Sequence, residues 1–109
     1  MVPVKIELPA STPSDLHDEF VGILRQLGPL QDLSAKSFDL NTAMLVLAAV
    51  SATADLLAIA NLLLAWREKA HRRGVPLDKV TLVAGDRRIS LENTDVQTLV
   101  RVLESVAGE

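Results

Sequence analysis

The segment from Ala43 to Trp66 constrains the fold more than any other part of this sequence. Its 24 residues contain one charged side chain, that of Asp55. A segment of this length and polarity is long enough to cross a bilayer, and the arginines and lysine that follow it suit a cytoplasmic flank. The same segment is also typical of the most buried part of a small domain. Two interpretations follow: a membrane-associated component inserting residues 43–66, or a domain whose core contains them.

The polar residues within this segment favour the second interpretation. Asp55 lies near the middle, where an aspartate costs about 2.5–3.5 kcal/mol on insertion scales. Ser51, Thr53 and Asn61 add further polar groups. The N-terminus lacks the basic and then apolar pattern of a secretory signal. We therefore expect a cytoplasmic protein, with membrane association as the alternative.

The N-terminal part of the chain predicts a strand followed by a helix. Apolar residues alternate with other residues over residues 1–10, which is typical of a half-buried strand. Pro3 lacks the N–H that a ladder needs, so this strand lies at a sheet edge or begins there. A helix is predicted over residues 12–28, capped by Thr12 and ended by Gly28 with the proline after it.

The middle of the chain is harder to assign. We predict a short strand over residues 37–40 and an apolar helical region over residues 41–73, with a break at residues 51–53 where Ser and Thr favour caps. Periodicity does not distinguish a helix from a buried strand in the continuous apolar run of residues 43–50.

The C-terminal part predicts a hairpin and a closing helix. Alternating apolar residues over residues 79–91 flank a turn at Gly85. A helix is expected over residues 94–106, with a capping box between Thr94 and Gln97. Residues 1–109 thus form a single α+β domain, approximately β-α-β-α-β-β-α, with helices packed on a small sheet.

The second half of the apolar segment carries too wide an apolar surface for a simple surface helix. At about 100° per residue, its apolar side chains cover an arc of roughly 220°, whereas a surface helix needs little more than 100°. One explanation is a central core helix, packed between the sheet and the terminal helices. The other is that part of the arc docks a protein partner or a second copy. The candidate interface residues are Leu56, Ile59, Leu63 and Trp66.

The composition argues against several classes of ligand. Three aromatic side chains, those of Phe20, Phe38 and Trp66, supply no stacking platform for bases or sugars. A net charge of −3 argues against nucleic acid as the main ligand. With no cysteine, disulfides and thiolate metal sites are excluded. We expect no metal and no cofactor.

No group of residues predicts catalysis. His17 lies among acidic residues, but adjacent helical positions point in different directions, so it pairs with none of them. His71 lies among the charged residues at the end of the apolar helical region, which complement the helix dipole. The sequence contains neither a nucleophile elbow nor a phosphate-binding glycine loop. We therefore expect no enzymatic activity. A weak basic patch for phosphate or an acidic partner is the remaining candidate, formed by Arg67, Lys69, Arg72, Arg73, Arg87 and Arg88.

Residues 43–106 resemble the effector-associated constant component family of bacterial conflict systems. The resemblance rests on a leucine-rich segment that ends in Trp66-Arg67, on the strand-turn-strand of residues 80–91, and on the short amphipathic helix after it. Two features differ: Ser51-Ala52-Thr53-Ala54 stands where the family has a glycine-rich break, and the turn lacks a second glycine.

This resemblance implies a function in protein interaction. The family is thought to supply a constant partner to variable effectors, such as peptidases and nucleotide-dependent regulators. It has no catalytic residues, so none are assigned here. Resemblance and residue patterns together predict a non-catalytic adaptor that binds an effector or regulator, or forms an oligomer.

Overall fold

A computed structural model of the chain describes residues 3–33, 42–51 and 53–107. Eight helices and strands lie in these ranges, together with two short 3-10 helices at Leu77–Lys79 and Leu91–Asn93. In chain order they are β1 (Val4–Pro9), α1 (Ser14–Arg25), β2 (Leu30–Asp32), β3 (Thr42–Leu47), α2 (Leu56–Arg72), β4 (Thr81–Ala84), β5 (Arg87–Ser90) and α3 (Val96–Ala107). The expected α+β class is confirmed.

The five strands form one antiparallel sheet in the order β2-β3-β1-β4-β5. Its centre is β1, where Val4 pairs with Leu47 of β3 on one side and with Ala84 of β4 on the other. The sequence predicted that this strand lies at a sheet edge or begins at Pro3, and the edge position is wrong. Pro3 immediately precedes β1, so its missing N–H lies outside the ladder and does not interrupt the central strand.

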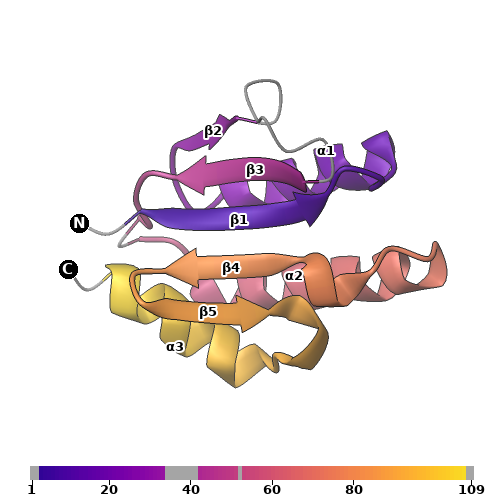
Figure 1. Ribbon diagram of the computed structural model, residues 1–109. Coiled ribbons are helices and arrows are strands. Elements are labelled where there is room, and N and C mark those ends of the chain that lie inside the picture. Colours follow the sequence, from indigo (N-terminus) through magenta and orange to yellow (C-terminus); the bar gives the residue numbers. More distant parts are fainter. Residues whose placement is uncertain (1–2, 34–41, 52, 108–109) are drawn as a thin grey trace.

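The three helices cover one face of the sheet and give the domain two layers (Figure 1). The inner face of the sheet consists of buried apolar residues, such as Ile6, Leu45 and Leu82, which are paired across β3, β1 and β4. Of the three helices, α2 lies between the other two and contacts both α1 and α3. The sheet and both helices therefore cover much of the circumference of α2.

The predicted helical region of residues 41–73 is wrong in its first part. Residues Thr42–Leu47 form β3, whose alternate residues Ala43, Leu45 and Leu47 are buried. Helix α2 begins only at Leu56, where the carboxylate of Asp55 accepts a hydrogen bond from the Ala58 N–H at 3.1 Å. The single charge of the apolar segment is therefore the N-cap of a helix. Residues 43–66 form no continuous helix, and none of the described helices is long and apolar enough to cross a membrane.

Two helix caps differ from the sequence prediction. The hydroxyl of Thr12 donates to the Pro9 carbonyl at 2.7 Å, and α1 begins two residues later. At α3 the cap is Asp95, whose carboxylate accepts the Thr98 N–H at 2.8 Å, while the Thr94 hydroxyl donates to the Ser90 carbonyl. That hydrogen bond from Thr98 lowers the pKa of Asp95. The predicted capping box is therefore replaced by a single aspartate cap.

Strands β4 and β5 form a hairpin whose two-residue turn begins at Gly85, with a φ of 63°. This left-handed conformation suits glycine and matches the twist of a tight hairpin. Strand β2 was not anticipated from the sequence, and the strand predicted over residues 37–40 lies outside the described residues.

We expect Gly28→Ala to destabilise the domain. The turn after α1 packs against the chain after β3 through two hydrogen bonds, from the Ser51 N–H to the Leu27 carbonyl (2.6 Å) and from the Ala48 N–H to the Pro29 carbonyl (3.0 Å). A Cβ at residue 28 would overlap the Ala49 backbone carbonyl. The backbone must shift to relieve this overlap, so we expect a loss of about 1–3 kcal/mol in the free energy of unfolding.

Urea denaturation followed by circular dichroism measures this loss. The control is Gly22→Ala, since a Cβ at that helical position meets no atom within 4 Å. Alanine also has the higher helix propensity, so this control should be neutral or stabilising. Equal stability of the two variants would contradict the close approach at Gly28.

Candidate functional site

Three of the four residues predicted to form an interface lie in the core. Ile59, Leu63 and Trp66 are buried, and Leu56 is half-buried and packs against the core. The structure corrects the prediction for these three residues, because the sheet, α1 and α3 of the same chain already cover them. The explanation of α2 as a central core helix therefore accounts for most of its apolar arc.

Trp66 is held by specific contacts to α1. Its indole Nε1 donates a hydrogen bond to the Leu16 carbonyl at 2.8 Å, and its ring centroid lies 4.5 Å from that of Phe20 at an interplanar angle of 52°. Both aromatic side chains are fully buried. These contacts fix the rotation of α2 about its axis, and with it the residues that α2 presents to solvent.

Two large apolar side chains of the described residues remain exposed, Leu57 (57% exposed) and Leu62 (41%). They are five residues apart on α2, which places them about 140° apart around the helix axis. Leu62 lies two turns before Lys69, which pairs with Glu19 of α1 at 2.8 Å, so Leu62 is on the flank of α2 nearer α1. Leu57 lies on the other flank, beside α3.

Leu57 lines a hollow between α2 and α3, which we call the α2–α3 groove. Its volume is about 320 Å³. Val96 and Val100, one turn apart on α3, are half-buried in it and also pack against the core. Its lining residues are Leu57, Val96, Gln97, Val100, Arg101 and Glu104. The groove thus combines three apolar side chains with a cation, an anion and an amide, all three exposed.

The basic residues proposed as a patch do not form one surface. Arg67 donates to the Leu91 and Thr94 carbonyls at 3.3 and 2.8 Å, which ties α2 to the turn before α3. Arg88 pairs with Glu7 at 2.7 Å on the sheet face that the helices leave open, whereas Arg72 lies on α2.

Most of these cations already have partners within the chain. Lys69 pairs with Glu19, and Arg73 pairs with Asp15. The hydrogen bond from Arg73 lowers the pKa of Asp15. Arg87 is exposed on β5 and follows the hairpin turn. The six residues of the predicted basic patch are therefore divided between the end of α2 and the hairpin, and Arg67, Lys69, Arg73 and Arg88 are engaged by carbonyls or carboxylates of the same chain.

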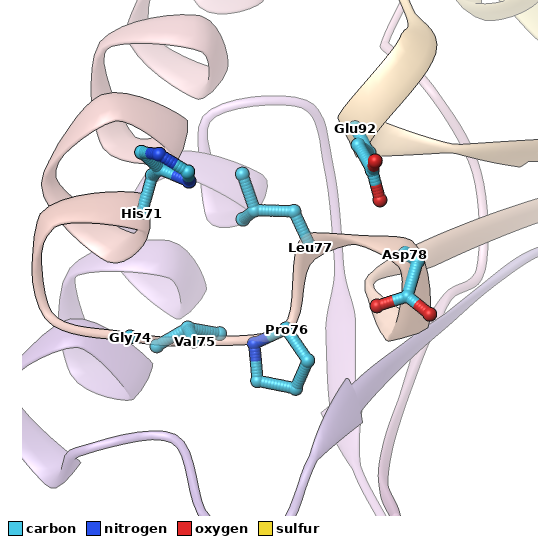
Figure 2. Close-up of a pocket in the computed structure, with 7 residues that line it drawn as sticks. All are labelled: His71, Gly74, Val75, Pro76, Leu77, Asp78 and Glu92. Carbon is cyan, nitrogen blue, oxygen red and sulfur yellow. The ribbon is translucent and has the colours of Figure 1, made fainter.

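A second hollow, of about 350 Å³, lies at the end of α2 and contains His71, Asp78 and Glu92. Figure 2 shows the Leu77 side chain between His71 and the two carboxylates. Among the described residues, no group of three histidine or carboxylate side chains is arranged to hold a metal ion. Because an apolar side chain lies between them, His71 and the two carboxylates are not arranged as an acid–base pair.

A third hollow, of about 340 Å³, lies on the open face of the sheet. One carboxylate oxygen of Glu7 accepts hydrogen bonds from Arg88 at 2.7 Å and from the Thr81 hydroxyl at 3.1 Å. Asp78 and Lys79 also line this hollow. Two acids and two bases leave it without a preferred sign of charge.

Comparison of the chain with models of protein families, with curated proteins and with solved structures found no match. The functional argument therefore rests on the residues and their geometry. Among the three hollows, the α2–α3 groove is the one that contains a largely exposed leucine. This groove is the candidate functional site.

Proposed function

We propose that this protein is a non-catalytic adaptor module that docks another protein chain in the α2–α3 groove. The observation that carries the proposal is the exposure of Leu57, a large apolar side chain, beside two half-buried valines of α3. Covering the exposed part of one leucine contributes about 1 kcal/mol to binding. Apolar side chains surrounded by polar ones are a common pattern at protein interfaces.

The geometry also explains why Leu57 belongs to a docking surface and not to the core. Asp55 caps α2, and Trp66 fixes its rotation against α1. With this rotation the buried residues face the sheet, and Leu57 faces α3 near its exposed side. Since Leu57 lies in the first turn of α2, a polar residue there would favour the helix terminus, and the leucine brings no benefit to the cap.

The resemblance to the effector-associated constant components supports an adaptor role in a bacterial conflict system. The three parts on which it rests correspond to α2, the β4–β5 hairpin and α3, and the groove lies between α2 and α3. In this proposal the partner is an effector or regulator of the same system, and the protein acts in the cytoplasm. The absence of cysteine suits that reducing compartment.

A non-catalytic role agrees with the side chains that line the hollows. Of the three hollows described, one is lined by a histidine, His71. No serine or threonine lines that hollow. Acid–base or nucleophilic catalysis needs a positioned pair of such groups. The groove contains one carboxylate, that of Glu104, but no histidine, serine or threonine, which favours binding over chemistry.

We expect Leu57→Asp to abolish partner binding while the domain stays folded. A carboxylate in the first turn favours the α2 dipole, so folding should be preserved. At the interface the charge would be desolvated against two valines, so we expect at least a tenfold loss of affinity. Proteins retained by the tagged chain are quantified by mass spectrometry, and the retained partner is then purified and titrated against wild type and variant.

Leu62→Asp is the matched control, since it introduces the same charge on the opposite flank of the same helix. It should bind like wild type. A purified partner that binds all three proteins equally would show that the groove is not the docking surface.

A further inference from the structure

One flank of α2 carries both Leu57 and Arg67. Together with Ala60 and Leu64 these residues follow spacings of three and four, so they lie along one line on the helix surface. Leu57 lines the α2–α3 groove. Arg67 lies ten residues later, about 15 Å further along the axis, and contacts the chain that leads into α3. This flank therefore faces α3 at one end and the entry to α3 at the other.

Arg67 holds the turn before α3 at both of its ends. Its Nη1 donates hydrogen bonds to the carbonyls of Leu91, the first residue of the short 3-10 helix, and of Thr94, the residue after it. A charged donor makes such bonds stronger than neutral ones. The ion pairs found among the described residues do not include Arg67, unlike Lys69 and Arg73, which pair with carboxylates of α1. Arg67 is thus matched to backbone atoms, whose positions follow the fold.

The turn that Arg67 contacts is itself held by hydrogen bonds. The Ser90 hydroxyl accepts the Glu92 N–H and donates to the Leu77 carbonyl, both at 3.3 Å. The hydroxyl of Thr94, a residue that is only 5% exposed, donates to the Ser90 carbonyl. Because these bonds join the residues on either side of the 3-10 helix, the turn moves as one unit. A displacement at Arg67 is therefore passed on to the start of α3.

The path from this turn to the groove is two residues long. Thr94 is followed by Asp95, which caps α3, and then by Val96, which begins α3 and lines the groove. Val100 lies one turn further on the same side of α3. The position of the Thr94 carbonyl therefore decides where these two valines lie relative to α2.

We infer that Arg67 is a positioning residue for the docking groove. It sets the place of α3 beside Leu57 and so shapes the surface that a partner contacts. Arg67 does not line the groove, so it acts from outside the binding surface. This inference rests on the proposed function, since it concerns the geometry of the same site.

Arg67→Met tests the inference in the free protein. Methionine keeps an aliphatic side chain of similar reach but has no N–H to donate. In methyl carbon–proton NMR spectra, the signals of Val96 and Val100 should move, while those of core residues of the sheet, such as Ile6, should stay in place. Lys69→Met is the matched control, because it removes a cation from the α1 side of the same helix. It should leave both valine signals unchanged.

Binding to the purified partner gives the second readout. We expect Arg67→Met to raise the Kd about tenfold and Lys69→Met to leave it unchanged. Arg67→Lys should lie between wild type and Arg67→Met in both measurements, because its ammonium can still donate to a carbonyl but lacks the planar fork. Circular dichroism verifies folding, and if Arg67→Met does not fold, Arg67→Lys takes its place in both comparisons.

The outcomes separate this inference from the proposed function. Valine signals that stay in place in the Arg67 variant, or that move equally in Lys69→Met, overturn the positioning role. If Leu57→Asp abolishes binding but the Arg67 variant binds like wild type, the groove is the docking site and the inference alone fails. If Leu57→Asp also binds like wild type, the proposed function fails, and moved valine signals then show only that Arg67 places α3.

Discussion

Replacing Trp66 with alanine is expected to lower the free energy of unfolding by about 3–5 kcal/mol. The indole is fully buried between α2 and α1, where it contacts the Phe20 ring and donates a hydrogen bond to the Leu16 carbonyl. Alanine removes both contacts and leaves a cavity in the core. The stability of a domain of this size is typically 5–15 kcal/mol, so the loss is a large fraction of the total. Urea denaturation followed by far-ultraviolet circular dichroism measures it, because the chain has no other tryptophan for fluorescence.

Trp66→Phe separates the ring from its hydrogen bond. Phenylalanine retains an aromatic ring next to Phe20 but has no N–H to donate to the Leu16 carbonyl. We expect a loss of about 1–3 kcal/mol, between wild type and the alanine variant. If Trp66→Ala were as stable as wild type, α1 and α2 would not pack through this residue. If it changed oligomeric mass without changing stability, the indole would belong to an interface.

Leu63→Asp is expected to prevent folding. Leu63 has no exposed surface and lies on the side of α2 that faces the core. The substitution loses the transfer free energy of a leucine, about 2–5 kcal/mol with the cavity included. It also places an unpaired carboxylate in the core, with a penalty of several kcal/mol. Together these losses reach the whole stability of a typical domain.

Leu62→Asp is the matched control for this experiment too. It introduces the same charge one residue earlier, at a side chain that is 41% exposed, so the domain should remain folded. Circular dichroism and one-dimensional proton NMR of both variants decide the matter. If the Leu63→Asp protein were folded but no longer bound its partner, Leu63 would belong to an interface and not to the core.

These variants divide the apolar arc of α2 into two parts with different functions. Leu63 and Trp66 stabilise the domain, and their substitution affects folding before it affects any partner. Leu57 is the residue whose substitution should affect binding alone. Sequence reasoning missed Leu57 because the arc was treated as one surface, whereas α3 covers only part of its flank. Leu57 could be recognised only from the position of α3 beside α2, and the sequence of α2 does not predict that position.

The residues Arg101 and Glu104 were missed for a similar reason. On the sequence they are ordinary charged positions of an amphipathic helix, and such positions are usually solvated. Their relevance appears only when Leu57 of α2 is placed beside them.

Several elements could be predicted from the sequence because their signals are local. Pro13 and the Gly28-Pro29 pair bracket α1, and Gly85 supplies the left-handed residue that the β4–β5 turn requires. The amphipathic pattern of α3 likewise depends on its own residues. In each case a few neighbouring residues fix the backbone through capping, turn geometry or periodicity.

The tertiary structure alone decided the rest. The run from Ala43 to Val50 is apolar on both possible faces, so its own sequence does not distinguish helix from strand, and pairing with β1 makes residues 42–47 a strand. Pairing with two neighbours likewise makes β1 the centre of the sheet. Which apolar residues of α2 are core and which remain exposed depends on how much of its surface the sheet, α1 and α3 cover. Burial belongs to the packed arrangement of distant segments, so no local pattern determines it.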